Sequence, residues 1–295
     1  MNNRFVLSGC GTALVTPFKD GAVDYQSYAS LVERQVEAGI HFLVPLGSTA
    51  ETPCLEDDEK LKVLELTREI AGDKTILAGV GTNSLKQTLR NMKLLGEHGA
   101  DMFLVVVPYY NKPTARGQYE YFKAVASETD KPVILYNVPG RTGTNMTAET
   151  TLRLAEIENI IAIKEASGDL GQIKAIIEGA PDGFSVLSGN DDQTVDIMKM
   201  GGAGVISVAS NIAPSLVVKM TEAAACGDFN EADSLNARLM PLFENCFVES
   251  NPIPVKAGLA AMGLIRNELR LPLTTSEDST YDLMAKTIDG LQNMI

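Results

Sequence analysis

An apolar run that ends in two charged residues lies at Ile160-Ile161-Ala162-Ile163-Lys164-Glu165. Its apolar residues do not alternate with polar ones, which is typical of a strand buried on both faces in a parallel sheet. Seven more short apolar runs, bounded by Gly, Pro or Asn, lie along the first 210 residues. We therefore expect eight buried strands, at residues 12–16, 42–46, 75–80, 102–107, 133–136, 160–164, 184–188 and 205–208.

The spacing of these runs indicates how the strands are arranged. Successive runs begin about 28 residues apart, which is the size of one strand-helix unit. Helical spacing appears between them, for example at Leu85, Leu89, Met92 and Leu95. Eight such units predict an α/β fold, the (β/α)8 or TIM barrel. An open doubly wound sheet is the alternative, although residues 79–84 lack the third glycine of a dinucleotide-binding motif.

The chain beyond the eighth run has helical character and exceeds what one closing helix needs. One face of the last segment carries Met284, Ile288, Leu291 and Ile295. The sequence thus predicts a barrel domain over residues 1–225 and a C-terminal helical domain over residues 226–295. We expect three helices in the second domain, at residues 229–248, 255–264 and 279–294.

Composition excludes several classes of protein. The 295 residues include 38 Asp plus Glu against 25 Lys plus Arg, and the net charge of −13 argues against a nucleic-acid-binding surface. The content of 45% hydrophobic and 21% charged residues is that of a globular protein. No segment approaches the roughly 20 consecutive apolar residues of a membrane span, and no secretory signal follows Met1. We therefore expect a cytoplasmic protein without membrane contact.

Two histidines and four cysteines leave little material for a metal site or for histidine-based catalysis. Cys10, Cys54, Cys226 and Cys246 include no Cys-x-x-Cys pair, which is typical of reduced, buried thiols. The acidic residues 57–59 are interpreted as the start of a helix and not as metal ligands. We expect neither a metal ion nor a cofactor.

Lys164 ends the predicted sixth strand, and the active site of a TIM barrel lies at the carboxyl ends of its strands. Tyr136 ends the fifth strand and Thr49 follows the second, so the three side chains are expected at one mouth. A lysine amine is nucleophilic only when neutral, and an apolar wall favours the neutral form by desolvation. This pattern indicates Schiff-base chemistry with a carbonyl substrate, in which the tyrosine hydroxyl moves protons. The alternative is that Lys164 is a solvated strand cap.

Two loops indicate the charge of the substrate. Arg141 lies in residues 139–143, beyond Tyr136, where its guanidinium can form two hydrogen bonds with a substrate carboxylate. The alternative is that it is a surface arginine in a turn. Asp191 and Asp192 follow the seventh strand, where many barrels bind phosphate, and they would repel that group. We interpret the two aspartates as a helix start and expect a substrate without phosphate.

These residues occur in motifs that resemble the pyruvate-dependent class I aldolase and lyase superfamily, and most closely its dihydrodipicolinate synthase family. The similarity extends over essentially the whole chain, and several motifs in the same order make it specific. The matching segments are residues 11–18, 47–52, 107–113, 136–143, 163–168, 187–189, 204–207 and 251–256.

The resemblance implies that Lys164 forms an imine with pyruvate and that the resulting enamine attacks L-aspartate 4-semialdehyde. This is the first committed step of the diaminopimelate route to lysine. The resemblance also implies that Tyr136 donates and accepts the protons, and that Ser48 and Tyr110 complete its relay. In the family the relay tyrosine reaches into the partner subunit, so we expect a homotetramer built from dimers.

The substrate-binding residues are carried over on the same basis. Thr49 is expected to bind the pyruvate carboxylate, and main-chain groups near Gly189 and Ile206 to line the same pocket. Arg141 is expected to bind the carboxylate of the aldehyde substrate.

Some members of the family are inhibited by lysine, which they bind at the dimer interface. Asp57, Lys60 and Gln87 depart from the pattern of these regulated members, so strong feedback inhibition is not expected. The corresponding positions here are Thr52, Asp57, Lys60, Asn83, Gln87 and Tyr109.

Two other activities are weighed against this one. Ser48 stands where the family usually has threonine, as in the sialic acid lyase branch, so an N-acetylneuraminate lyase or a 2-keto-3-deoxy sugar acid aldolase is the first alternative. Arg141 argues against it, because the sugar-acid branches generally lack an arginine there. A small-molecule binding protein without catalysis is the second alternative, and it predicts no covalent adduct.

Overall fold

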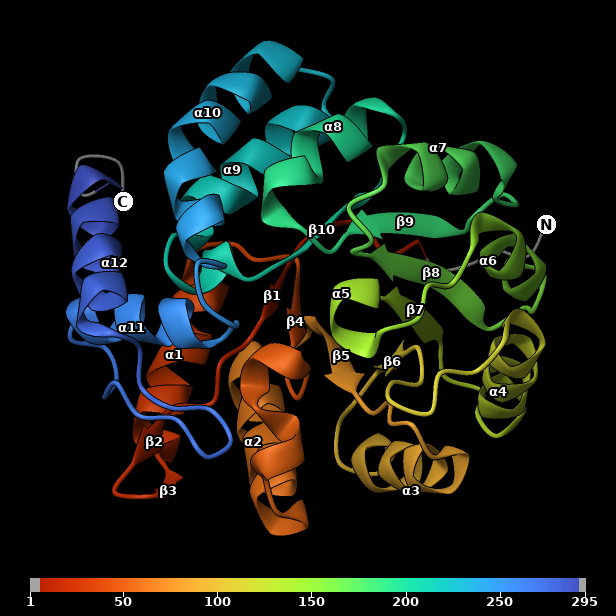
Figure 1. Ribbon diagram of the computed structural model, residues 1–295, viewed down its shortest axis with the longest axis horizontal. Helices are drawn as coiled ribbons and strands as arrows, with labels where there is room; N and C mark the ends of the chain where they lie inside the picture. Colours follow the sequence, from red (N-terminus) through yellow and green to blue (C-terminus); the bar gives the residue numbers. More distant parts are fainter. Residues whose placement is uncertain (1–5, 292–295) are drawn as a thin grey trace.

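The computed structural model describes residues 6–291, and its centre is a closed barrel of eight parallel strands (Figure 1). The strands follow the order β1-β10-β9-β8-β7-β6-β5-β4, and β1 pairs with both β4 and β10. The predicted TIM barrel is therefore confirmed, and the open sheet is excluded. The barrel strands are β1 (Gly9–Ala13), β4 (Phe42–Val44), β5 (Thr75–Gly79), β6 (Met102–Val106), β7 (Val133–Asn137), β8 (Ile160–Glu165), β9 (Ser185–Ser188) and β10 (Gly204–Ser207).

Helices surround the barrel and connect its strands (Figure 1). The connection from β1 first forms a small hairpin of β2 (Phe18–Lys19) and β3 (Ala22–Val23), which the sequence did not predict. A short helix, α5 (Pro139–Thr142), follows β7 and places Arg141 in a helical turn rather than in a loop. The helices between and after the strands are α1 (Tyr25–Glu37), α2 (Asp57–Ala71), α3 (Leu85–Gly96), α4 (Ala115–Ser127), α6 (Ala148–Ala155), α7 (Leu170–Gly179), α8 (Thr194–Lys199) and α9 (Pro214–Ala225).

Side-chain caps explain where several of these helices begin. The Ser84 hydroxyl accepts a hydrogen bond from the Gln87 amide, so Ser84 caps α3. Glu56 and Glu59 form a reciprocal capping box at the start of α2. The acidic residues 57–59 thus begin a helix, as the sequence predicts, and they are placed where the helix dipole favours negative charge.

Two hydrophobic layers hold the barrel together. The inner layer fills the barrel with side chains such as Phe42, Leu77, Ile134 and Leu187, each no more than 1% exposed. The outer layer packs the opposite faces of the same strands against the surrounding helices. Because both strand faces are buried, the strands have the continuous apolar character from which they were predicted.

The first strand lies earlier in the chain than predicted. β1 covers Gly9–Ala13, whereas the apolar run suggested residues 12–16. A Cβ atom at Gly11 would lie only 2.0 Å from the Phe42 ring, so the close packing of β1 against its neighbour requires glycine. Gly9 and Gly11 interrupt the apolar run. The hydrophobic pattern alone therefore predicts a strand that begins too late in the chain.

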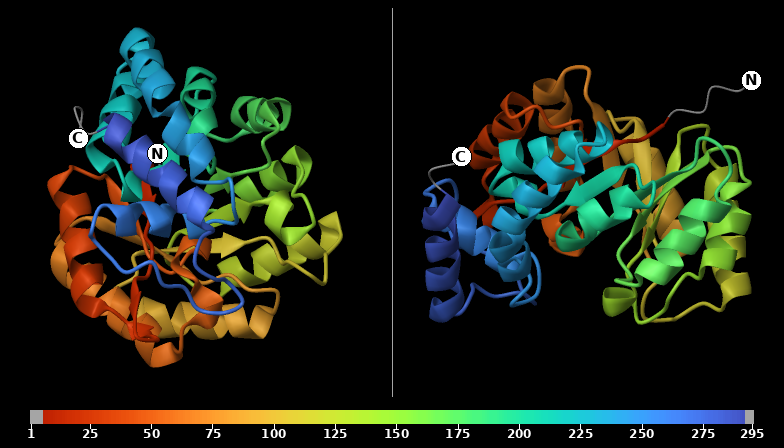
Figure 2. Two further views of the ribbon diagram at one scale, coloured as in Figure 1. Left: turned by 60° about the vertical axis from the view of Figure 1, so that its left-hand side comes forward. Right: turned by 90° about the horizontal axis from the view of Figure 1, so that it is seen from above.

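Three helices follow the barrel, as predicted: α10 (Phe229–Asn245), α11 (Ile253–Ala261) and α12 (Asp278–Leu291). Figure 2 shows α11 and α12 together at one side of the barrel. Met284, Ile288 and Leu291 are buried on one face of α12, whereas the predicted last positions of this helix, with Ile295, lie outside the described residues. α10 packs on α9 of the barrel and on α12, so it joins the two predicted domains, and their boundary at residue 225 stays a prediction.

The prediction that the cysteines are buried thiols is confirmed for two of the four. All four are free; Cys10 and Cys246 are buried, as predicted, but Cys226 is exposed and Cys54 is half-buried. Burial raises the pKa of both Cys10 and Cys246 well above the usual thiol range, so these thiols stay protonated. Within residues 6–291, no helix has the length and apolarity needed to cross a membrane.

We predict that Gly79→Ala is strongly destabilising. A Cβ at this position would lie 2.0 Å from the carbonyl oxygen of Leu46, and backbone atoms cannot rotate away. The free energy of unfolding is expected to fall by about 3 kcal/mol, as for severe overpacking, measured by chemical denaturation. Gly290→Ala in α12 is the matched control, because a Cβ there meets no atom within 4 Å. Equal stability of the two variants would contradict the prediction.

Candidate active site

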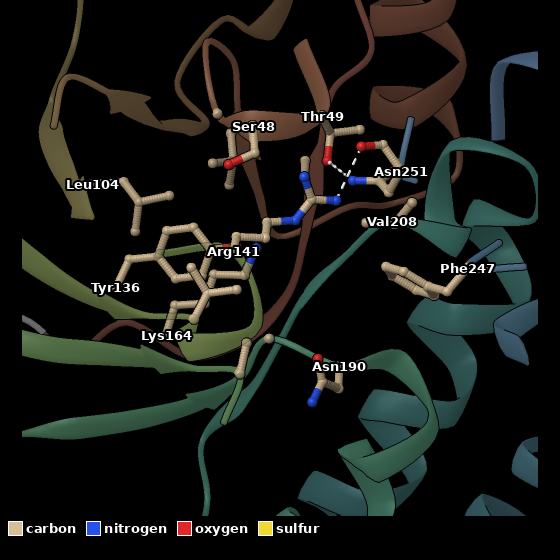
Figure 3. A pocket seen from close by; sticks show the side chains of 16 residues that line it. Ser48, Thr49, Leu104, Tyr136, Arg141, Lys164, Asn190, Val208, Phe247 and Asn251 are labelled. Carbon is tan, nitrogen blue, oxygen red and sulfur yellow. Dashed lines mark hydrogen bonds between the residues drawn. The ribbon is translucent and has the colours of Figure 1, made fainter. Parts of the chain in front are cut away.

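A cavity of about 180 Å³ opens at the carboxyl ends of the barrel strands. Six of the eight predicted site residues line it, and Figure 3 shows most of these side chains. The two exceptions are Tyr110 and Ile206. The six lining residues are Ser48, Thr49, Tyr136, Arg141, Lys164 and Gly189.

Lys164 and Tyr136 form the inner part of the cavity. They are register partners on β8 and β7, and the Lys164 Nζ atom lies 4.5 Å from the centre of the Tyr136 ring. Lys164 is only 5% exposed, which excludes the interpretation of a solvated strand cap. Figure 3 shows the two side chains next to each other. The strand register therefore brings an amine and a phenol together at one end of a small cavity.

The walls around Lys164 are largely apolar. Ala13, Val44, Leu104 and Val138 line the same cavity, and each comes from, or directly follows, a barrel strand. The next residue along β8, Glu165, is fully buried and has its carboxylate bound by other groups.

Thr49 and Arg141 are joined by a residue that was not predicted as part of the site, Asn251. The Asn251 Nδ2 atom donates a hydrogen bond of 3.0 Å to Thr49 Oγ1, and Arg141 Nη2 donates one of 3.0 Å to the Asn251 carbonyl oxygen (Figure 3). A hydroxyl that accepts from an amide keeps its own proton for another acceptor. Thr49 can therefore donate to a substrate carboxylate, and Arg141 offers a charged donor close by.

Asn251 also carries an unused acceptor. It is 5% exposed, and within residues 6–291 its Oδ1 atom has no hydrogen-bond partner. Buried polar atoms are rarely left unpaired, so this oxygen is available to a bound molecule. The sequence signal was limited to the motif at 251–256; nothing in it indicated that Asn251 reaches the cavity.

Ser48 and Thr49 belong to one turn but differ in exposure. They begin the 3-10 helix η1 (Ser48–Ala50), which follows β4 after residues 45–47. Ser48 is exposed at the mouth, whereas Thr49 is only 3% exposed. The turn thus offers one hydroxyl to the entrance and one to the interior of the cavity.

Tyr110 and Ile206 take other positions in the single chain. Tyr110 is 88% exposed in the loop after β6 and has a φ of 68°, a conformation in which few non-glycine residues occur. Ile206 lies fully buried in the inner layer of the barrel on β10. Neither side chain contributes to the cavity of one protomer, and the roles expected of both residues stay predictions.

Asp191 begins a helix, as the sequence predicted, but its side chain is buried. It is 2% exposed, and its Oδ2 atom accepts hydrogen bonds of 3.0 Å from the amides of Val208 and Ala209. Burial raises its pKa, although these hydrogen bonds and nearby Lys164 oppose the shift. Asp191 therefore joins the loops that follow β9 and β10 behind the cavity. It begins η3 (Asp191–Gln193), but its carboxylate serves the neighbouring loop.

Comparison with known proteins gives one consistent result. Residues 6–291 match the Dihydrodipicolinate synthetase family. The 4-hydroxy-tetrahydrodipicolinate synthase of Phocaeicola vulgatus is 47% identical over 289 residues, which cover 97% of each chain. The crystal structure of the dihydrodipicolinate synthase from Thermotoga maritima has a TM-score of 0.95 at 43% identity, covering 97% of this chain and 98% of that one. The chloride-inhibited dihydrodipicolinate synthase from Acinetobacter baumannii, crystallised with pyruvate, has a TM-score of 0.94 at 40% identity, covering 97% and 99%.

We predict that Gly189→Ala displaces the Lys164 side chain. A Cβ at position 189 would lie 2.6 Å from the Ala166 Cβ and 3.1 Å from the Lys164 Cε, so the amine must move. Labelling of Lys164 by a small 2-oxo acid and borohydride is expected to fall at least about tenfold, a loss of 1.4 kcal/mol, and peptide mass spectrometry measures it. Gly140→Ala, where a Cβ meets no atom within 4 Å, is expected to keep full labelling. Unchanged labelling of Gly189→Ala would contradict the prediction.

Proposed function

Because this chain belongs to the dihydrodipicolinate synthetase family, we propose that it condenses pyruvate with L-aspartate 4-semialdehyde through a Schiff base on Lys164. The product is 4-hydroxy-tetrahydrodipicolinate, the compound for which its relatives are named. The observation that carries the proposal is the position of Lys164, buried beside Tyr136 in the cavity at the carboxyl ends of the strands. This reaction is a first step toward diaminopimelate and lysine.

The reaction requires only groups that the chain supplies. The Lys164 amine adds to the pyruvate ketone and water leaves, which gives an imine. Loss of a methyl proton gives an enamine, whose carbon attacks the aldehyde carbon while the aldehyde oxygen takes a proton. The amino group of the second substrate then adds to the imine carbon, closes the ring and displaces Lys164. One water is released overall, and the lysine is regenerated without metal or cofactor.

Proton transfer is assigned to hydroxyl groups. Tyr136 lies beside the Lys164 amine, where a phenol can serve imine formation and C–H cleavage. Ser48, at the entrance of the same cavity, extends the relay toward solvent. Tyr110 completes it from a second copy of the chain, and its 88% exposure in one protomer supports that assignment. On this proposal the enzyme works as an assembly of dimers, a homotetramer, in the cytoplasm.

The two substrate carboxylates are assigned to two side chains, Thr49 and Arg141, which Asn251 joins through hydrogen bonds. Thr49 donates its hydroxyl proton to the pyruvate carboxylate, and Gly189 lines the same cavity. The main chain near Ile206 is assigned to this subsite from the family resemblance alone. Arg141, held through the Asn251 carbonyl, binds the carboxylate of the aldehyde substrate. Weak feedback inhibition by lysine stays a prediction. It agrees with the ion pairs of Asp57, whose carboxylate is paired with Lys60 and Arg90 rather than standing free.

Treatment with pyruvate and borohydride is expected to fix one pyruvyl group on Lys164. Reduction converts the imine to a stable amine that peptide mass spectrometry locates. Lys256 is an internal control, since this second buried lysine lies outside the cavity and should remain unlabelled. An active enzyme without an adduct on Lys164 would contradict the Schiff-base mechanism, and the complete absence of an adduct and of turnover would favour the binding protein.

Arg141→Ala is expected to lower kcat/KM for L-aspartate 4-semialdehyde about tenfold to a hundredfold, the loss of a charge-assisted hydrogen bond. The amount of pyruvyl adduct on Lys164 at saturating pyruvate should change little, because the first carboxylate is bound by Thr49. Arg238→Ala, at an arginine of α10 away from the cavity, is the matched control. An enzyme indifferent to Arg141→Ala would instead point to the sugar-acid branch, which the relatives do not favour.

A further inference from the structure

A second lysine is buried in this protein, below the turn that carries Ser48 and Thr49. Lys256 of α11 is fully buried, and its Nζ atom lies 2.7 Å from Oε1 of Glu51, which is 3% exposed. Two buried charges cost several kcal/mol each in desolvation, so such a pair adds little or nothing to stability compared with apolar residues. Its presence directly behind the cavity calls for another explanation.

The ion pair is held on all sides. The Lys256 ammonium also donates to the carbonyl oxygen of Thr16 at 2.9 Å and lies 4.3 Å from the centre of the Phe18 ring. The second oxygen of Glu51, Oε2, accepts a hydrogen bond of 3.0 Å from the Arg270 amide. Both partners therefore have a fixed geometry, which a network with each member satisfied can impose.

The pair connects two segments that meet again in the cavity. Glu51 ends η1, two residues after Thr49, and has a φ of 53° that a glutamate adopts only when its surroundings hold it. Lys256 follows Asn251 by five residues and lies in the helix that begins directly after Pro252. The side chains of Asn251 and Thr49 then form their 3.0 Å hydrogen bond at the cavity wall. The same two segments are thus joined by the Glu51–Lys256 ion pair and again by the hydrogen bond between Asn251 and Thr49.

We propose that Glu51 and Lys256 are positioning residues, whose ion pair fixes the turn after β4 so that the Thr49 hydroxyl meets the carboxylate of the first substrate. This inference rests on the proposed function, because it names that carboxylate as pyruvate's. A displaced turn leaves Lys164 able to react but weakens the binding that precedes the reaction. The pair therefore acts mainly on KM for pyruvate and less on the chemistry at Lys164.

The charge of Lys256 makes this role dependent on pH. Burial lowers the pKa of Lys256 to about 8, although Glu51 and Glu268 oppose the shift; Arg270 acts in the same direction as burial. Arg270 itself pairs with Glu59 of α2 at 2.6 Å. Since the folded protein holds the lysine proton less tightly, the ion pair is complete below about pH 8 and is lost as the pH rises through this value.

The test is the double variant Glu51→Gln/Lys256→Met, which removes both charges at nearly constant volume. Glutamine keeps an acceptor for the Arg270 amide, and removal of both charges avoids an unpaired buried ion, so the variant is expected to melt close to the parent protein. At pH 7 its KM for pyruvate is expected to be about ten times that of the parent, equal to 1.4 kcal/mol of binding. Since the parent loses its own ion pair above pH 8, this ratio should approach one at pH 9.5.

Glu51→Gln alone provides a second folded test, because the remaining lysine can become neutral when its partner loses charge. It is expected to raise KM for pyruvate to a similar extent. The control Lys199→Met/Asp233→Asn removes an ion pair of 2.6 Å between α8 and α10, outside the cavity, and should leave KM unchanged at every pH.

A KM ratio that stays below two at pH 7 would overturn the positioning role, and a tenfold ratio that does not fall at pH 9.5 would overturn its dependence on pH. The proposed function is judged separately on the parent protein. If the parent forms no pyruvyl adduct on Lys164, that function fails and this inference fails with it. If the parent reacts normally and the folded variants bind pyruvate equally well, only the inference fails.

Discussion

β1 pairs with β4 on one side and with β10 on the other, and this closure leaves the barrel strands without a free edge. It also fixes all eight carboxyl ends around one mouth, so side chains far apart in the sequence are held within reach of each other. The register between β7 and β8 then places Tyr136 opposite Lys164. Both residues are anchored on strands rather than loops, which fixes the position of the Lys164 amine relative to the Tyr136 ring.

The remainder of the site depends on a second level of organisation outside the barrel. Asn251, which precedes α11, joins Thr49 and Arg141 through two hydrogen bonds, and the Glu51–Lys256 ion pair holds the same segments from behind. The C-terminal helices thus do more than cover one side of the barrel. The loop between α10 and α11 supplies part of the wall of a cavity whose floor the strands provide, and a barrel alone would leave the Thr49 hydroxyl without its partner Asn251.

Periodicity and position at strand ends were enough to predict the barrel and the centre of the site. Lys164 and Tyr136 were recognised because closure brings strand ends together, whatever the details of packing. The start of β1 was misplaced because Gly9 and Gly11, required by close packing against His41 and Phe42, carry no hydrophobic signal. Asn251 and Lys256 could not be assigned to the site, since their contacts join residues about 200 positions apart and depend on how α11 packs. The burial of the Asp191 carboxylate could not be predicted, because spacing along the chain cannot reveal that the next loop folds over it.

The order of these segments along the chain has a consequence for how the protein is made. A nascent chain that has emerged through β10 already contains Lys164, Tyr136, Ser48, Thr49 and Arg141, and its barrel can begin to close. It still lacks Asn251 and Lys256, so the turn after β4 has no partner to hold it. Lys164 is therefore synthesised well before the residues that complete the wall of its cavity, and that cavity is whole only when translation has passed the start of α11.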